Sequence, residues 1–260
     1  MGQTIAVFSQ KGGTGKTTTV RTLHDALSRA GLSVLAVDLD PQGNLSDYFD
    51  IDANATPTVV EVLTGDASAA KAVHTGIIPA NPQLAGAELA LAGKIGRELT
   101  LKRAIKPLID EYDYILFDCP PSLGLLTVNA LVAADWALIT AEAQHFAMQG
   151  VEQALEVMDV TRDALNPDLE WLGVVLNIAD MRTNHSREAR EALIEDHGDK
   201  VFETAIRQSI AYPEAAERAV SIIDYRPDLA DDYVNLAREV LTRLGDKTAA
   251  KRLQQELAAA

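Results

Sequence analysis

The sequence predicts an α/β fold in which a mostly parallel, twisted sheet is flanked by helices. Short apolar runs alternate with longer segments of helical periodicity, which is typical of β-α-β units. Each apolar run ends in a polar, glycine-containing or proline-containing turn. The chain has 260 residues, of which 47% are hydrophobic, so it can bury a sizeable core and is not a disordered protein.

The expected elements follow from these apolar runs. The first strand is TIAVF at residues 4–8, and a glycine-rich loop follows it directly. A helix is expected at 17–30, because Val20, Leu23 and Leu27 share one face and Gly31 follows its end. Further strands are expected at 33–37, 114–117, 137–140 and 172–176, and further helices at 99–109, 125–133, 148–165, 186–196, 231–244 and 247–260.

One domain is expected over residues 1–260, with the C-terminal helical segment 228–260 packed on it. No proline-rich or glycine-rich linker and no internal repeat divides the chain. Residues 52–96 are irregular and rich in small side chains, so we assign no element there.

Composition limits the class of protein. The net charge of −15 argues against a basic protein that coats nucleic acid with its whole surface. Cys119 is the single cysteine, so no intramolecular disulfide can form and a cysteine-ligated cluster would need a second subunit. The sequence has neither a basic leader nor an uncharged apolar run of the roughly 18 residues that a membrane helix needs. We therefore expect a cytoplasmic protein.

The stretch SQKGGTGKTTT, residues 9–19, has the composition of a phosphate-binding loop. It lies between a strand and a helix, so backbone N–H groups and the positive end of the helix dipole point to one place. Gly12, Gly13 and Gly15 let the backbone approach a ligand closely. Lys16 would reach the β- and γ-phosphates, and the Thr17 hydroxyl would complete a Mg²⁺ shell. The alternative is a plain glycine- and threonine-rich turn before a helix.

The segment KGGTGKTTT resembles the deviant Walker A loop of the ParA/MinD family of ATPases. The resemblance extends over residues 4–240 and favours a ParA/Soj-type chromosome or plasmid partition ATPase with a P-loop NTPase fold. It implies ATP and Mg²⁺ as cofactors and a homodimer on ATP binding, in which Lys11 touches the phosphates held by the partner. A solvated lysine at a strand end is the alternative for Lys11. The nucleotide contacts implied in the loop are Gly12, Gly13, Thr14, Gly15, Lys16, Thr17 and Thr18.

Aspartates end two further apolar runs, VLAVDLDPQGNLS and YDYILFDCPPSLG. Strand-end carboxylates beside a phosphate loop lie where Mg²⁺ and an attacking water sit. The resemblance implies that Asp40 positions or activates the water and that Asp38 lies near the metal shell. It also implies that Asp118 holds Mg²⁺ through water, and that residues 120–124 form a mobile switch. The catalytic set is Lys11, Lys16 and Asp40, and the metal set is Thr17, Asp38 and Asp118.

The base of the nucleotide is expected near two later segments. Family members read adenine with an asparagine at the end of a late strand, and Asn177 matches that position. Ile206, Arg207 and Gln208 would flank the base. The family usually has Ile-Pro-Arg there, so Arg207 stands at the place of the proline.

The cargo of the ATPase is less defined. Partition relatives bind DNA non-specifically as ATP dimers, and a ParB-like centromere-binding partner triggers hydrolysis. The loop that carries two of their arginines has Gln208 and Ala211 instead. Three alternatives follow: DNA binding is weaker, it has moved to Arg207 and Arg218, or it is absent. The candidate DNA contacts are Arg187, Arg207 and Arg218. Such binding would make the protein nucleoid-associated.

A MinD-like positioning ATPase that acts on a non-DNA cargo or surface through an adaptor is the main alternative. The segment 247–260 carries too few bulky apolar side chains for direct membrane binding. A metabolic P-loop enzyme, such as an ATP-dependent ligase, would share the fold but leave Lys11 without a role. We therefore predict a DNA partition ATPase that hydrolyses ATP to ADP and phosphate.

Overall fold

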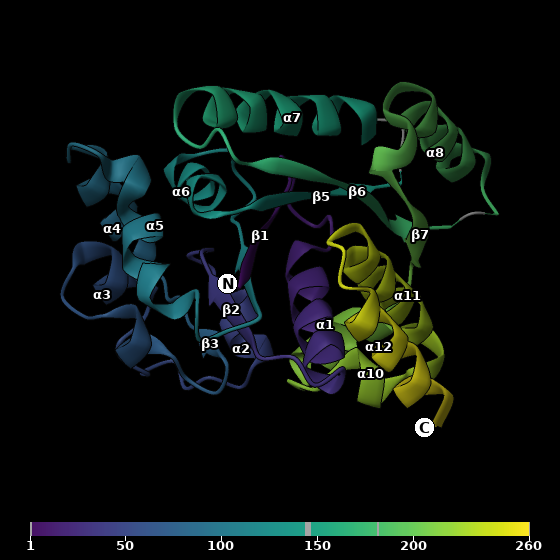
Figure 1. The fold of residues 1–260 in the computed structure, drawn as a ribbon, viewed down its shortest axis with the longest axis horizontal. Coiled ribbons are helices and arrows are strands. Elements are labelled where there is room, and N and C mark those ends of the chain that lie inside the picture. Colours follow the sequence, from purple (N-terminus) through teal and green to yellow (C-terminus); the bar gives the residue numbers. More distant parts are fainter. Residues whose placement is uncertain (1, 144–146, 181, 260) are drawn as a thin grey trace.

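The computed structural model describes residues 2–143, 147–180 and 182–259, and a seven-stranded parallel sheet forms its centre. The strands lie in the order β3-β2-β4-β1-β5-β6-β7 (Figure 1). β1 therefore has a neighbour on each side, β4 and β5, and the chain order reverses there. Ligands of open α/β sheets bind at this kind of switch point, beyond the carboxyl ends of the strands. The strands are β1 (Gln3–Phe8), β2 (Val34–Asp38), β3 (Ile77–Ile78), β4 (Tyr114–Asp118), β5 (Trp136–Glu142), β6 (Glu170–Ala179) and β7 (Val201–Arg207).

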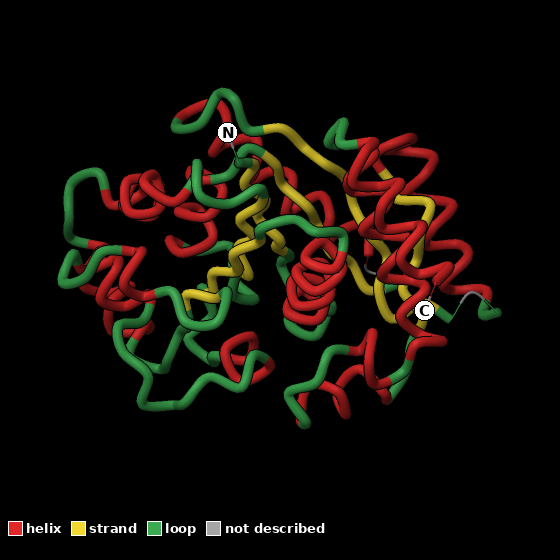
Figure 2. Tube along the Cα trace, turned by 60° about the horizontal axis from the view of Figure 1, so that its bottom comes forward, coloured by secondary structure: helices red, strands yellow, loops and turns green. Residues whose placement is uncertain are grey.

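Helices cover both faces of the sheet, which leaves two apolar cores (Figures 1 and 2). Successive side chains of β1 show the division, since Ala6 and Phe8 belong to one core and Ile5 and Val7 to the other. One face carries α3 (Val59–Thr64), α4 (Leu84–Ala92), α5 (Thr100–Ile105), α6 (Leu125–Ala133), α7 (Ala147–Ala164) and α8 (Asn184–His197). The other carries α1 (Lys16–Arg29), α2 (Asn44–Tyr48), α9 (Ala211–Glu217), α10 (Ile222–Tyr225), α11 (Pro227–Arg243) and α12 (Lys247–Ala259).

The predicted α/β class is confirmed, and the five expected strands correspond to β1, β2, β4, β5 and β6. β3 and β7 were not predicted. β3 has only two residues, and β7 is an edge strand whose sequence, VFETAIR, is half polar. Neither has the continuous apolar run that marks the inner strands.

The single helix expected at 99–109 was wrong. This segment consists of α5 between two 3₁₀ turns, η2 (Arg97–Leu99) and η3 (Lys106–Leu108). Pro107 lies in the first turn of η3, where it cannot donate the backbone hydrogen bond that would continue α5.

Residues 52–96, which the sequence left unassigned, contain α3, β3, α4 and the 3₁₀ turn η1 (Ala69–Ala72). α3 begins with a capping box, in which the Thr58 side chain accepts from Val60 N and the Glu61 carboxylate accepts from Thr58 N. The signal for that box, Thr-x-x-Glu, was present in the sequence. A last 3₁₀ turn, η4 (Gly198–Lys200), precedes β7.

The C-terminal helices complete the second core. α11 and α12 lie against α1, and α11 also lies along β7 (Figure 1). Ala249, Ala250 and Leu253 of α12 are buried in the same core as Leu23 of α1. Within the part of the chain that the structure describes, no helix is both long and apolar enough to span a membrane.

Candidate nucleotide-binding site

The glycine-rich loop joins the carboxyl end of β1 to the first turn of α1. Gly13 and Gly15 have φ angles of 76° and 81°, which only glycine adopts without strain. Gly15 is the N-cap of α1, and it offers no side chain to bind the first N–H groups of the helix. These N–H groups remain available to an anion.

A chain of hydroxyl groups fixes the loop to the sheet. Ser9 Oγ lies 2.8 Å from Thr14 Oγ1, and Thr14 Oγ1 lies 2.9 Å from Thr140 Oγ1 on β5. Sequence reasoning missed both Ser9 and Thr140. For Thr140 the reason is that a contact across 126 residues leaves no local signal.

Lys16 is folded back over the loop. Its Nζ donates to Ser9 Oγ at 3.1 Å and to the Lys11 carbonyl at 3.0 Å. Burial lowers the pKa of Lys16, and the nearby Asp118 carboxylate opposes that shift. A buried ammonium beside exposed backbone N–H groups is suited to binding a phosphate.

Thr17 and Asp118 are in contact at the end of β4. Thr17 Oγ1 donates to Asp118 Oδ2 at 2.7 Å. The other oxygen, Oδ1, is buried and finds no donor among the described residues. Burial raises the pKa of Asp118 well above its usual value, and the charge of Asp38 adds to this. An acceptor of this kind, left without a donor, fits the water shell of a cation.

Both carboxylate oxygens of Asp38 accept hydrogen bonds from the segment that follows it. Its Oδ1 accepts from Asp40 N at 3.0 Å, and its Oδ2 accepts from Ser46 N and Ser46 Oγ at 3.0 and 2.7 Å. Burial raises the pKa of Asp38 to about 6, although the Ser46 hydrogen bonds act in the opposite direction. Ser46 also accepts from Ala80 N at 2.9 Å, so it joins α2 to the segment after β3. Sequence reasoning missed Ser46, although it ends the aspartate-containing stretch.

Asp40 lies in the turn between β2 and α2. Its Oδ1 accepts from Gln42 N at 2.9 Å, and its side chain is largely buried at the edge of a cleft. Gly43, with a φ of 68°, ends the turn and is the N-cap of α2. The turn therefore holds a carboxylate beside the glycine-rich loop.

A cleft of about 780 Å³ extends from the loop to the segment after β7, and its size is suited to a nucleotide. Tyr48, Tyr212 and Tyr233, which sequence reasoning missed, also line it. Most of the predicted nucleotide contacts line this cleft: Gly12, Gly13, Gly15, Lys16, Thr17, Thr18, Asn177, Ile206, Arg207 and Gln208.

Asn177 joins β6 to the glycine-rich loop and to α1. Its Nδ2 donates to the Thr14 carbonyl at 2.7 Å and to Thr19 Oγ1 at 3.2 Å. Its Oδ1 is buried and has no hydrogen-bond partner among the described residues. That oxygen can accept from a donor on a bound ligand.

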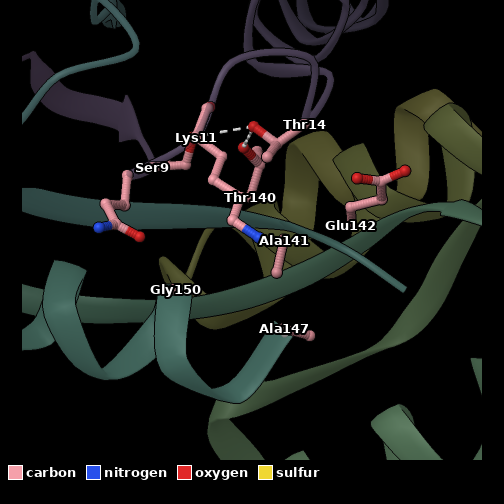
Figure 3. A pocket seen from close by; sticks show the side chains of 9 residues that line it. Ser9, Lys11, Thr14, Thr140, Ala141, Glu142, Ala147 and Gly150 are labelled. Carbon is pink, nitrogen blue, oxygen red and sulfur yellow. Dashed lines mark hydrogen bonds between the residues drawn. The ribbon is translucent and has the colours of Figure 1, made fainter. Parts of the chain in front are cut away.

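Lys11 and Thr14 do not line this cleft. They border a smaller hollow on the β5 side of the loop, together with Glu142 from the end of β5 and Gly150 from α7 (Figure 3). The Thr14 hydroxyl points toward Thr140, and the exposed Lys11 side chain extends from the loop across the hollow toward Ala141 of β5 (Figure 3).

The three arginines predicted to contact DNA lie on separate elements. Arg187 is exposed on α8 and donates to Asn184 Oδ1 at 2.6 Å. Arg207 ends β7 and is paired with Asp232 at 2.8 Å. Arg218 follows α9 and lies over the Tyr225 ring, 4.9 Å from its centroid. α8 covers one face of the sheet and α9 the other, so these side chains do not form one cluster.

Within residues 2–143, 147–180 and 182–259, no group of three or more histidine, cysteine, aspartate or glutamate side chains could hold a metal ion.

Comparison with known proteins identifies the family. The AAA domain family model matches residues 2–171. The sporulation initiation inhibitor protein Soj of Bacillus subtilis is 41% identical over 92% of this chain and 98% of its own length. The chromosome partitioning protein ParA of Myxococcus xanthus is 36% identical over 97% of this chain and 93% of its own.

Two solved structures share the fold and contain ADP and magnesium. A cobyrinic acid a,c-diamide synthase from Mycobacterium smegmatis is 39% identical, with a TM-score of 0.75, over 84% of this chain and 93% of its own. The septum site-determining protein MinD from Pyrococcus horikoshii is 26% identical, with a TM-score of 0.77, over 97% of this chain and 99% of its own. With its glycine-rich loop at the centre of a parallel sheet, the chain belongs to the ParA/Soj family of P-loop NTPases.

Proposed function

We propose that the chain is a Mg²⁺-dependent ATPase that dimerises when it binds ATP and acts as a switch in DNA partition. The observation that carries this proposal is the group of Lys16, Thr17 and Asp118 at one end of a cleft, with Asp40 at its edge. The names of the Soj and ParA relatives support the role in partition.

The residues of the site have separate tasks. Bound Mg²⁺ would neutralise phosphate charge, with Thr17 and Asp118 holding it. Lys16 exchanges its loop acceptors for phosphate oxygens, and the N–H groups of the loop and α1 bind the same phosphates. Asp40 orients a water for attack on the terminal phosphorus. Asp38 holds the turn that carries Asp40, through its bonds to Asp40 N and Ser46.

We assign Lys11 a role at the interface of the dimer rather than in the nucleotide cleft of its own subunit. Its side chain is exposed and lies on the other side of the loop from the cleft. A lysine in that position can reach phosphates held by a second copy, which makes ATP binding and dimerisation one event. A ParB-like partner would then stimulate hydrolysis and release the dimer.

A non-DNA cargo is the second candidate. Gln208 and Ala211 stand where partition relatives have arginines, and Ala211 is buried. A MinD-like switch that acts through an adaptor needs no DNA contacts at these positions. A metabolic reaction, as the name of the Mycobacterium smegmatis structure indicates for that protein, would leave Lys11 without a role.

DNA binding by the Asp40→Ala protein tests the proposal. This substitution should keep ATP and the dimer while blocking hydrolysis. We expect binding to unrelated duplexes with ATP but not with ADP, and affinity that falls as salt rises. An ATP dimer that ignores DNA at every salt concentration would refute the DNA role and favour the adaptor.

The dimer is tested separately by sedimentation of the Lys11→Ala protein. We expect it to remain a monomer with ATP, while Lys94→Ala, which changes an exposed lysine after α4, still forms the ATP dimer. Equal dimer formation by both variants would remove Lys11 from the interface.

A further inference from the structure

Arg207 is held by three hydrogen bonds at the last residue of β7. Its backbone N and its Nε both donate to Asp232 Oδ2, at 3.1 and 2.8 Å. Its Nη2 donates to the Asp228 carbonyl at 2.8 Å. Both acceptors belong to the N-terminal half of α11, so the arginine joins the end of a strand to a helix.

The helix that holds Arg207 is itself a wall of the cleft. Tyr233, next to Asp232, lines the cleft and is 1% exposed. Its ring meets that of Tyr212 edge to face, with the centroids 5.6 Å apart. The part of α11 to which Arg207 is bonded is therefore packed in place.

The end of β7 and the turn after it, residues 206–210, form the neighbouring wall. Ile206 is buried, and Gln208 N donates to the Ala179 carbonyl at 3.3 Å. Ile210 lines the cleft with 77% of its surface exposed, so it offers an apolar contact to a flat ring. The segment is thus fixed to β6 by a backbone bond and to α11 by Arg207.

We propose that Arg207 is a positioning residue for the nucleotide cleft and not a DNA contact. It holds residues 206–210 in place before the ligand arrives, so binding does not have to order them. Its Nε and Nη2 are committed to Asp232 and the Asp228 carbonyl, so the guanidinium is tied to α11. This inference rests on the proposed nucleotide binding by the cleft.

Binding of a fluorescent ADP analogue to the full chain tests the inference. Arg207→Ala should weaken binding by about 3- to 10-fold, the range for a half-exposed charged hydrogen bond. Asp232→Asn, which keeps the side-chain shape, should also weaken binding. The double variant should bind the analogue no more weakly than Arg207→Ala alone. Arg207→Lys should recover only part of the loss, because an ammonium lacks the guanidinium fork.

Arg226→Ala is the matched control. Arg226 forms a two-bond pair with Asp228 at the same end of α11, but it does not line the cleft. The Arg226→Ala protein should bind the fluorescent ADP analogue as tightly as the unchanged protein does. In ATPase assays, Arg207→Ala should raise KM by a larger factor than it lowers kcat, whereas general destabilisation would lower the active fraction and leave KM unchanged.

The outcomes separate the two proposals. Failure of the unchanged protein to bind ADP would refute the proposed function. If that protein binds ADP and Arg207→Ala binds it equally well, the positioning role is refuted. A loss of DNA affinity at saturating ATP, with a smaller salt slope, would instead make Arg207 a phosphate contact on DNA.

Discussion

Two carboxylates lie side by side at the ends of neighbouring strands. Asp38 and Asp118 are register partners of β2 and β4, and both are buried. Asp38 has three donors, whereas Asp118 has only Thr17 for one of its oxygens. Of the two, Asp118 therefore has the acceptor oxygen that a hydrated cation requires. Burying that oxygen without a donor lowers the stability of the protein.

Asp118→Asn should stabilise the nucleotide-free protein. The substitution removes a buried charge beside Asp38 without changing the shape of the side chain. We expect the melting temperature to rise by about 2–4 °C, equivalent to about 1 kcal/mol for a chain of this size. Mg²⁺-dependent hydrolysis should fall by about tenfold or more. Asp110→Asn, at an exposed site, should change neither quantity, and unaltered hydrolysis in Asp118→Asn would remove Asp118 from the metal site.

At the scale of the elements, the glycine-rich loop and α1 require a backbone conformation that only glycine adopts easily. Gly15 combines a left-handed conformation with close contact to Asn177, since a Cβ built there would lie 2.6 Å from Asn177 Nδ2. Gly86, inside α4, has open space around it. The same change to alanine should therefore have opposite effects at the two positions.

Gly15→Ala should lower the free energy of unfolding by about 1–3 kcal/mol, because of strain and the clash with Asn177. Gly86→Ala should raise it by about 0.5–1 kcal/mol, because alanine restricts the unfolded chain and favours the helix. Urea denaturation measures both. Loss of stability in Gly86→Ala, or none in Gly15→Ala, would contradict this account of the loop.

At the scale of the whole molecule, α12 completes the second core. Leu253 is 1% exposed, and its neighbours Ala249 and Ala250 are also buried. These three side chains of α12 are packed in the core that α1 and α11 share.

Leu253→Ala should cost about 2–4 kcal/mol of unfolding free energy, as for other buried leucines. Gln254→Ala, one residue further on the exposed side, should cost almost nothing. The urea midpoints of the two variants provide the measurement. Equal midpoints would mean that α12 unfolds independently of the rest.

The sequence predicted those features that have a local signal. The inner strands are continuous apolar runs, and the loop is a compact motif, so both were placed within a few residues. The contributions of Thr140, Tyr212 and Tyr233 could not be predicted, because each meets the loop or cleft through contacts between distant segments. β7 was missed because an edge strand need not be apolar.

The central position of β1 also determines when the loop can form during synthesis. Gln3 pairs with Tyr114, and Ile5 pairs with Trp136, so the first strand has no partner until almost half of the chain exists. At ribosomal speed this delay is on the order of ten seconds. Until then the glycine-rich segment has no sheet edge to hold it. A nascent chain therefore acquires nucleotide affinity late, after β4 and β5 have left the ribosome.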